Sequence, residues 1–248
     1  MRETLIAGNW KLNGSSHSIT ELVGAIVSGM DDSHCSVAVC APYLYIPLVD
    51  ELLSNEAIKL GAQDVSEHKS GAYTGEISAA MLSEFNCAYG LVGHSERRTH
   101  HAETDAQVAA KFSALKHAGI APILCVGETL EEREQGVTQA VVSRQILAVI
   151  DRFGVDSLVG AVIAYEPVWA IGTGLTATPE QAQEVHADIR SLVSGYDKNI
   201  AAKVQILYGG SMNSANASSL LAMSDIDGGL LGGASLKADD FLAICRAA

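Results

Sequence analysis

A short apolar run passes directly into a turn-rich segment in the stretch Ala164-Tyr165-Glu166-Pro167-Val168-Trp169-Ala170-Ile171-Gly172-Thr173-Gly174. The run over residues 161–165 has the length of a buried parallel strand and is too short for a helix. Glu166 comes where this strand ends, and Pro167 cannot continue the hydrogen bonding of a sheet. Because the residue before a proline is also held in extended geometry, the sequence predicts a carboxylate fixed at the rim of an apolar core.

The segment that follows Glu166 combines apolar side chains with glycine. Residues 168–171 are all apolar, whereas Gly172-Thr173-Gly174 is typical of a loop. The next helix is expected to begin only after Thr178, because a capping-box spacing and a proline suited to the first helical turn occur there. From the residues alone, the segment 167–177 is either a lid that closes over a site beside Glu166 or a loop packed on the rim.

The alternation of a short apolar strand with an amphipathic helix extends along the whole chain. Strands are expected at residues 5–10, 37–41, 58–62, 89–93, 122–126, 161–166, 204–208 and 228–231. Helices are expected at about residues 18–28, 47–53, 78–84, 105–118, 137–150, 178–193, 215–222 and 236–246. Eight such units in about 250 residues favour an α/β fold, a closed (β/α)8 TIM barrel that forms one domain over residues 1–248. The alternative, an open doubly wound sheet, usually carries a glycine-rich dinucleotide turn after its first strand, and Gly8-Asn9-Trp10-Lys11 is not one.

Composition restricts the classes of partner and the compartment. The formal net charge of −13 over 248 residues disfavours nucleic acid as a partner, because that binding needs clustered cations. No apolar run is long enough to span a membrane, and the N-terminus lacks the plan of a signal peptide. The five cysteines are odd in number and lack CxxC spacing, which favours a reduced, cytoplasmic protein, with a catalytic thiol as the minor alternative. No Cys/His cluster has metal-ligand spacing, so we expect neither a metal nor an organic cofactor.

Polar residues at the carboxyl ends of the expected strands form the candidate site, because barrel active sites lie there. The first strand delivers Asn9 and Lys11, and a lysine at this position can neutralise a phosphate or an oxyanion. A solvated surface lysine is the alternative. The fourth strand delivers His94, which precedes a short helix whose positive end disfavours imidazolium. A neutral imidazole can donate a hydrogen bond to a carbonyl group.

Glycine pairs follow the last two strands, in Tyr208-Gly209-Gly210-Ser211 and in Gly232-Gly233. Residues without a Cβ let backbone amides approach an anion closely. An isolated pair is usually an ordinary turn, but barrels often bind phosphate after these two strands. In a chain this acidic, the attraction for an anion has to be local.

The motifs Asn9-Trp10-Lys11, Gly93-His94-Ser95-Glu96 and Glu166-Pro167-Val168-Trp169 resemble those of the triosephosphate isomerase family, and the resemblance covers essentially the whole chain. It implies an enzyme of glycolysis and gluconeogenesis that interconverts dihydroxyacetone phosphate and D-glyceraldehyde 3-phosphate through an enediolate, without a cofactor. It assigns the proton transfer to Glu166, and stabilisation of the enediolate to His94 and Lys11. It also implies that Asn9 and Lys11 bind the substrate and that Asn9 helps to hold the site. It assigns the substrate phosphate to Gly172, Ser211, Gly232 and Gly233.

The resemblance also implies supporting roles around these residues. Ser95 would hold Glu166 while the site is empty, and Glu96 would orient Lys11. Tyr208 and Gly210 would support the site after the seventh strand. The segment from Pro167 to Ala177, which includes Leu175 and Thr176, would be a lid that excludes water.

One exposed loop points to a second copy of the chain. The sequence Gly71-Ala72-Tyr73-Thr74-Gly75-Glu76 resembles the family's interdigitating loop, which docks beside the active site of a neighbouring subunit. The resemblance therefore implies a homodimer in which Thr74 reaches the neighbouring subunit's site.

Three positions depart from the family pattern. His101-Ala102-Glu103 stands where relatives often have phenylalanine-glycine-glutamate, a change in local packing, and Leu12 stands where many have methionine, a volume-conserving change. Leu175, at the far hinge of the lid, stands where relatives usually have lysine, and we expect altered lid opening with unchanged chemistry. For Arg97 and Arg98, structural ion pairs are the preferred interpretation.

Two other functions remain open from the residues alone. Another phosphate-binding barrel, such as an epimerase or an indole-pathway lyase, would share the glycines after the last two strands. It would not be expected to combine Asn9, Lys11 and His94 with Glu166-Pro167. A catalytically dead barrel kept as a binding or scaffold protein is the alternative from a different class.

Overall fold

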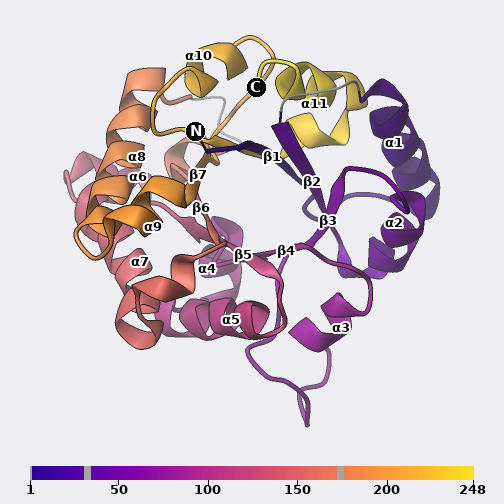
Figure 1. The fold of residues 1–248 in the computed structure, drawn as a ribbon, viewed down its shortest axis with the longest axis horizontal. Coiled ribbons are helices and arrows are strands. Elements are labelled where there is room, and N and C mark those ends of the chain that lie inside the picture. Colours follow the sequence, from indigo (N-terminus) through magenta and orange to yellow (C-terminus); the bar gives the residue numbers. More distant parts are fainter. Residues whose placement is uncertain (1, 31–34, 172–175) are drawn as a thin grey trace.

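Eight parallel strands, β1 to β8, pair in sequence order and close into a barrel, because β1 pairs with both β2 and β8 (Figure 1). The computed structural model describes residues 2–30, 35–171 and 176–248. The strands are β1 Thr4–Asn9, β2 Cys35–Ala41, β3 Lys59–Ala62, β4 Tyr89–Val92, β5 Ala121–Val126, β6 Val162–Tyr165, β7 Gln205–Tyr208 and β8 Gly228–Leu231. The predicted (β/α)8 barrel is confirmed, and most strand ends lie within two residues of those expected.

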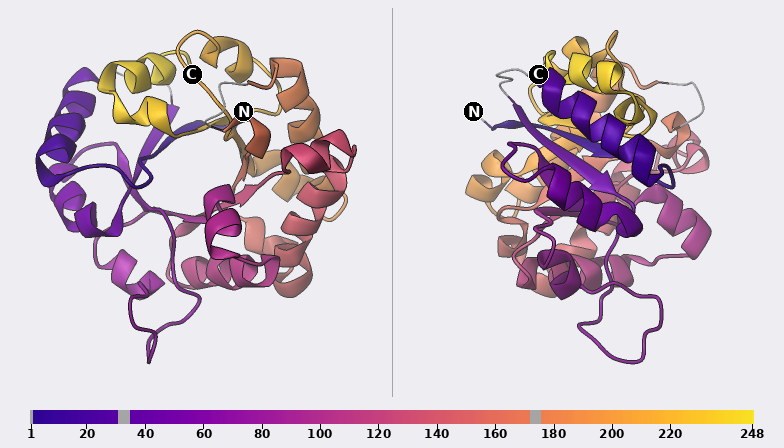
Figure 2. Two further views of the ribbon diagram at one scale, coloured as in Figure 1. Left: turned by 180° about the vertical axis from the view of Figure 1, so that it is seen from behind. Right: turned by 90° about the vertical axis from the view of Figure 1, so that its right-hand side faces the viewer.

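Helices surround the barrel on its outer side (Figures 1 and 2). The α-helices are α1 Ser16–Gly29, α2 Ile46–Leu52, α3 Ala79–Ser83, α4 Ser95–His101, α5 Asp105–His117, α6 Leu130–Glu134, α7 Thr138–Phe153, α8 Pro179–Ser194, α9 Lys198–Lys203, α10 Ala217–Leu221 and α11 Ala238–Cys245. Short 3₁₀ turns are η1 Tyr43–Tyr45, η2 Val155–Leu158, η3 Val168–Ala170 and η4 Gly233–Leu236. Thr178 caps α8 as expected, and its side chain accepts from the backbone N–H of Gln181 at 3.2 Å.

Two helical segments differ from the prediction. The helix expected over 137–150 is preceded by a separate short helix, α6, and the chain breaks at Gly136, whose φ of +70° suits glycine. Val137, expected on the apolar face, is instead the N-cap of α7 and is exposed. Helix α9 was not expected at all, although Asp197 caps it by accepting from the N–H of Ile200 at 2.9 Å.

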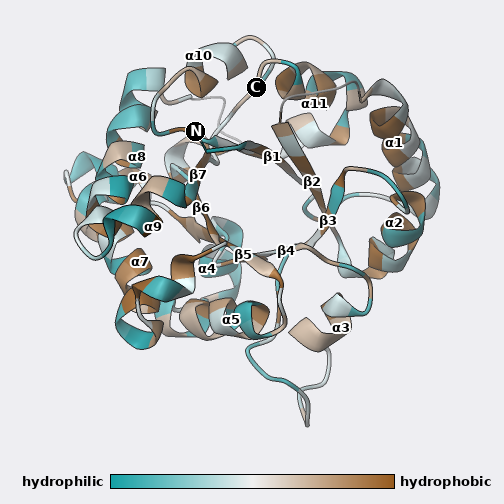
Figure 3. Ribbon diagram, in the orientation of Figure 1, coloured by the Kyte–Doolittle hydropathy of each residue, from teal (hydrophilic) through white to brown (hydrophobic). Residues whose placement is uncertain are grey.

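The core has two parts, separated by the wall of the barrel. One fills the interior with side chains from seven of the eight strands: Leu5, Ala7, Ala38, Cys40, Leu91, Ile123, Cys125, Val162, Ala164, Leu207 and Leu230. The other lies between the outer face of the strands and the helices, whose barrel-facing sides carry apolar residues and whose outer sides are hydrophilic (Figure 3). Both faces of each strand are therefore buried, which is why the strands read as continuous apolar runs.

The connection between β3 and α3 is the most projecting part of the chain in Figures 1 and 2. Near its tip the rings of His68 and Tyr73 stack in parallel, with centroids 3.6 Å apart. Tyr73 nevertheless remains 45% exposed. The loop is thus ordered by its own contacts while an aromatic surface stays uncovered.

His186 of α8 is fully buried against the barrel, where its ring lies edge-on to Tyr165. Burial lowers the pKa of His186 to about 4, and the hydrogen bond from Nδ1 to the carbonyl of Asp225 only partly opposes this effect. The ring is therefore neutral in the folded protein wherever the pH is above about 4.

We predict that His186 weakens the fold in acid. In the unfolded chain its pKa returns to 6.5, so between pH 6.5 and 4 the unfolded state binds a proton that the folded state does not. Stability is full above this window and falls as the pH drops through it, by up to about 3 kcal/mol. Urea unfolding of His186→Gln should show a shallower decline between pH 6.5 and 4.5 than the parent protein. His17→Gln, at an exposed histidine, is the matched control, and equal slopes in all three proteins would contradict the assignment.

Candidate active site

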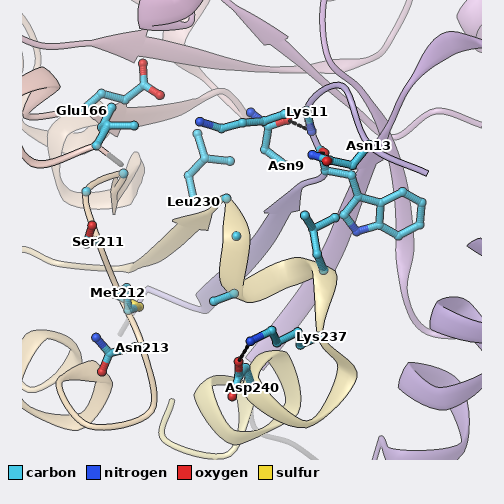
Figure 4. A pocket seen from close by; sticks show the side chains of 18 of the residues that line it. Asn9, Lys11, Asn13, Glu166, Ser211, Met212, Asn213, Leu230, Lys237 and Asp240 are labelled. Atoms are coloured by element: carbon cyan, nitrogen blue, oxygen red, sulfur yellow. Dashed lines mark hydrogen bonds and ion pairs between the residues drawn. The ribbon is translucent and has the colours of Figure 1, made fainter. Parts of the chain in front are cut away.

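A cavity of about 650 Å³ lies at the carboxyl ends of the strands. Its lining comes from the residues that follow β1, β4, β6, β7 and β8, among them Asn9, Lys11, His94, Glu166 and Ser211. Figure 4 shows Lys11 and Glu166 on different sides of this space, with the Lys11 amine directed across it. The barrel thus brings together side chains that are far apart in the sequence, such as Asn9 and Ser211, which are 202 residues apart.

Glu166 is almost completely buried directly after β6. Its Oε2 accepts from the backbone N–H of Ser95 at 2.9 Å, and its Oε1 lies 2.9 Å from Nε2 of His94. Burial alone would raise the pKa of Glu166, but His94, the Ser95 amide and Lys11 together outweigh it and hold the pKa below its usual range. The carboxylate is therefore ionised in this pocket. The expected hold on Glu166 by Ser95 comes from the backbone N–H.

His94 is the N-cap residue of α4, and this position orients its ring. Nδ1 accepts from the backbone N–H of Glu96 at 3.2 Å, which leaves Nε2 to carry the proton toward Glu166. The direction of the pKa shift differs from the expectation. Burial, the largest single cause, lowers the pKa of His94, but the carboxylates of Glu166 and Glu96 together raise it by more, so it lies above the ordinary value. Glu166 acts strongly because its Oε1 lies 2.9 Å from Nε2 of the ring. The hydrogen bond at Nδ1 nevertheless favours the neutral ring, since protonating Nδ1 would break it.

Lys11 has a left-handed backbone, with φ of +52°, which is unfavourable for a residue with a side chain. Asn9 stabilises this conformation, because its Oδ1 accepts from the N–H of Lys11 at 3.0 Å. The Lys11 amine forms an ion pair with Oε1 of Glu96 at 2.5 Å. Asn9 and Glu96 therefore fix the two ends of Lys11 and aim its amine at the cavity.

The segments after β7 and β8 form one wall of the cavity. A Cβ placed on Gly232 would lie 3.3 Å from Cε of Lys11, whereas one on Gly233 would meet no atom within 4 Å. Gly232 therefore lies beside Lys11, and the next residue, Gly233, faces open space. Ser211 donates from Oγ to the carbonyl of Ala170 at 2.9 Å, so it ties this wall to the segment after Glu166.

The segment after Glu166 is described at both ends, and Gly172, Thr173, Gly174 and Leu175 lie outside the described residues. At the near end, η3 carries Trp169, whose Nε1 donates to Oε1 of Glu128 at 2.9 Å. At the far end, Thr176 is exposed and Ala177 is buried. The near end of the expected lid is thus anchored to the loop after β5.

Glu128 is a site residue that the sequence reasoning missed. Its side chain is fully buried, and it also accepts from the hydroxyl of Tyr165 at 3.1 Å. Arg133 completes the cluster, 3.3 Å from Oε1 of Glu128 and with its guanidinium 4.5 Å from the centre of the Trp169 ring. The available signal was its position, since Glu128 stands two residues after the end of the apolar strand β5.

Tyr208 and Gly210 support the same region from β7. The Tyr208 side chain is buried; burial raises the pKa of its hydroxyl, and the amide of Ala177 opposes this rise. A Cβ on Gly210 would lie 2.3 Å from the Tyr208 hydroxyl oxygen and 3.0 Å from Cγ of Pro167. Gly210 therefore lets the tyrosine and the start of the expected lid approach each other.

Ion pairs hold the start of α4, as the sequence suggested for Arg97 and Arg98. Arg98 bonds Asp105 at 2.5 Å and donates from Nε to the carbonyl of Gly93 at 2.8 Å. Arg97 bonds Glu103 at 2.5 Å, and Glu103 also pairs with Lys111. Lys111 is 7% exposed and was not predicted to be buried. Because these charges are paired, the network fixes the backbone that carries His94 and Ser95.

A sequence model of the family described as triosephosphate isomerase matches residues 4–248 of this chain. The chain belongs to the triosephosphate isomerase family. Proteins named triosephosphate isomerase from Dechloromonas aromatica and Thiobacillus denitrificans are 58% and 55% identical to it over 248 residues, covering all of this chain and 100% and 99% of their own. One of the same name from Methylococcus capsulatus is 53% identical over 246 residues, covering 99% of this chain and 98% of its own. The resemblance inferred from the motifs is thereby confirmed at the level of the family.

The described residues of this triosephosphate isomerase family member contain neither a candidate metal site nor a helix that could span a membrane. Within residues 2–30, 35–171 and 176–248, no group of three or more His, Cys, Asp or Glu side chains is arranged to hold a metal ion. In the same residues, every helix is too short or too polar to cross a bilayer.

We predict opposite effects for alanine at two glycines of the cavity. Gly210→Ala should lower the melting temperature by several degrees, because its Cβ overlaps the buried Tyr208 hydroxyl. Gly233→Ala should leave the melting temperature within about 1 °C, since its Cβ enters open space. Differential scanning calorimetry of both variants checks this contrast, and equal melting temperatures would contradict the geometry at Gly210.

Proposed function

We propose that this protein interconverts dihydroxyacetone phosphate and D-glyceraldehyde 3-phosphate by proton transfer, with no cofactor. The observation that carries the proposal is the ionised Glu166, buried beside His94 and facing a cavity that Lys11 also enters. Membership of the triosephosphate isomerase family supports the same reaction. A second candidate, a binding protein without catalysis, has no observation that favours it over this one.

Glu166 is the base of the proposed reaction. Its carboxylate removes a proton from the carbon next to the carbonyl group and returns it to the neighbouring carbon, so one group acts as base and then as acid. In the present arrangement its two oxygens are held by Ser95 and His94. The substrate has to replace Ser95 and His94 as the partner of this carboxylate. The carboxylate then leaves a buried position in which it was ionised and shielded from water.

His94 and Lys11 stabilise the enediolate that forms between the two proton transfers. The Nε2–H of His94 donates a hydrogen bond to the developing oxyanion, as a neutral ring can. When Glu166 turns to the substrate, the largest cause that raises the pKa of His94 is withdrawn, so the pKa falls and the neutral ring is favoured. A carboxylate base beside a neutral histidine is the established arrangement of the triosephosphate isomerase family, so these two roles are not new.

The substrate phosphate is proposed to bind at Ser211, Gly232 and Gly233, with Gly172 as a fourth contact. Gly233 faces open space and Gly232 lies beside Lys11. Backbone amides that can approach an anion therefore lie next to a positively charged side chain. Such local attraction is needed because the net charge of the chain is −13. The segment 167–177 closes as the lid, with its near end anchored on Glu128.

We further propose a homodimer that works in the cytoplasm. Large apolar residues are exposed after three neighbouring strands: Leu12 at 98%, Leu44 at 81% and Tyr73 at 45%. The projecting loop that carries Tyr73, Thr74, Gly75 and Glu76 would cover such a surface on a second copy. Cys40, Cys87, Cys125 and Cys245 are free thiols, which supports a reducing compartment.

The test of the proposed reaction is an assay of the purified protein with dihydroxyacetone phosphate, coupled to oxidation of the aldehyde product. We expect turnover in the parent protein and a loss of at least about 10²-fold in kcat for Glu166→Gln, the scale of a lost general base. Glu180→Gln, at an exposed residue of α8, should keep full activity. No turnover in the parent protein would refute the function, and near-parental turnover in Glu166→Gln would refute the base.

We predict that Lys11→Met acts on binding. A lost charge-assisted hydrogen bond to phosphate should raise KM at least about tenfold, since such bonds contribute about 1.5–3 kcal/mol. Lys237→Met is the matched control, because Lys237 lines the same cavity but is 76% exposed and pairs weakly with Asp240 at 3.9 Å (Figure 4). If both variants keep the parental KM, Lys11 is only a surface cation.

We predict a solution mass of twice the 26.0 kDa chain in sedimentation velocity. Tyr73→Asp should shift the protein toward the single-chain mass, because a charge would enter an apolar contact. Tyr196→Asp, at another half-exposed tyrosine, should leave the mass unchanged. A single-chain mass for the parent protein would rule out the dimer.

A further inference from the structure

Gln145 is a buried polar residue of α7 that no step of the proposed reaction uses. Its side chain is 4% exposed, whereas all the other buried residues of this helix are apolar. Its amide bonds one residue twice: Oε1 accepts from the backbone N–H of Gly127 at 2.8 Å, and Nε2 donates to the carbonyl of Gly127 at 3.2 Å. The two bonds also fix the orientation of the amide, because exchanging its oxygen and nitrogen would set acceptor against acceptor and donor against donor.

The backbone of Gly127 continues β5 beyond the point where the neighbouring strand β4 ends. β4 pairs with β5 only as far as Val92 and Leu124, and Leu124 stands three residues before Gly127. A residue within a sheet has both its N–H and its carbonyl paired by the strands beside it. The Gln145 side chain therefore does for Gly127 what a neighbouring strand does for a residue within a sheet.

Gly127 also lies directly against the backbone of Glu166. A Cβ placed on Gly127 would overlap the carbonyl oxygen of Glu166. The residue before Gly127 is bonded to the same region, because the carbonyl of Val126 accepts from the N–H of Glu166 at 2.7 Å. The residue after it is bonded too, since the carbonyl of Glu128 accepts from the N–H of Val168 at 3.1 Å. This stretch of backbone therefore supports the main chain that carries the Glu166 carboxylate.

Open space borders the contact between Gln145 and Gly127. A second cavity, of about 430 Å³, is lined by both of these residues and also by Ser95 and Glu166. Because atoms that face a void lack packing partners on that side, packing alone does not prevent the Gly127 backbone from shifting. The two hydrogen bonds from Gln145 therefore supply the restraint.

We propose that Gln145 is a positioning residue for the proton transfer: by holding Gly127, it fixes the backbone of Glu166 and hence the place of the carboxylate. This role rests on the proposed function, in which Glu166 is the base. Gln145 is not among the residues that line the substrate cavity, so it acts through Gly127. The residues proposed to bind phosphate follow other strands, and the loss of Gln145 leaves them in place.

The experiment compares Gln145→Met with the parent protein in the assay with dihydroxyacetone phosphate. Methionine is a similarly long, unbranched side chain, but it bonds neither polar group of Gly127. We expect kcat to fall at least about tenfold, since a displacement of about 1 Å at a catalytic group can cost about 10²-fold. KM should stay within twofold, because the contacts with the phosphate are unchanged.

Val149→Ala is the control that separates positioning from stability. Val149 is a buried apolar residue one turn further along α7, so its truncation should lower the melting temperature. Its kcat should nevertheless stay within twofold of the parental value. If Val149→Ala and Gln145→Met lose kcat to the same extent, Gln145 has only a structural role and the proposal fails.

Hydrogen exchange of the Gly127 N–H, followed by nuclear magnetic resonance, tests the contact itself. In the parent protein this amide should exchange at least about tenfold more slowly than in Gln145→Met. Exchange at the rate of an unprotected amide in the parent protein would overturn the proposal even if the variant failed to fold. Parental kcat in Gln145→Met beside an active parent protein would overturn it as well. An inactive parent protein would instead refute the proposed function, and with it this role.

Discussion

The structure depends on one unfavourable placement, the burial of a charged carboxylate at the end of an apolar strand. Glu166 is 2% exposed, and removing a carboxylate from water is costly unless its oxygens are satisfied. Here the backbone N–H of Ser95 and the ring of His94, which both follow a different strand, contact the two carboxylate oxygens. The pocket therefore has to be built around the charge, and the two strands that carry these groups, β4 and β6, are both paired with β5 between them.

Further contacts fix the residues that surround the Glu166 carboxylate. His94 caps α4, and the first turn of that helix is fixed by ion pairs from Arg97 and Arg98 to acidic residues at its far end and beyond. On the other side, Tyr165 and Trp169 flank Glu166 in sequence and both bond to Glu128. A rigid frame on both sides of the carboxylate leaves its own side chain as the element free to move, which suits a group that has to exchange protein partners for a substrate.

The sequence was sufficient for the parts of the molecule that depend on local pattern. The continuous apolar strands and the cap at Thr178 predicted the barrel and the start of α8, because burial on both faces and capping are readable over a few residues. The residues at strand ends were brought together as expected, since parallel strands deliver their ends to one rim. Strand ends differed by a residue or two because the last hydrogen bond of a strand depends on its neighbour.

What the sequence could not provide were contacts between distant residues. Glu128 resembles an ordinary turn residue until Trp169, 41 positions later, donates to it. Lys111 reads as the outer face of a helix, yet it is buried against Asp64, 47 positions earlier. The pKa of His94 followed the charge that touches its ring rather than the helix end visible in the sequence, because that charge arrives from β6.

The pairing of β1 with β8 has a consequence for biosynthesis. The edge of β1 finds its partner only when residues 228–231 have left the ribosome, so the growing polypeptide carries an open parallel sheet for nearly its whole translation. Unpaired edges of this kind invite association with other nascent molecules. Asn9 and Lys11 are synthesised among the first residues, but they line a pocket only after the last strand has joined the barrel.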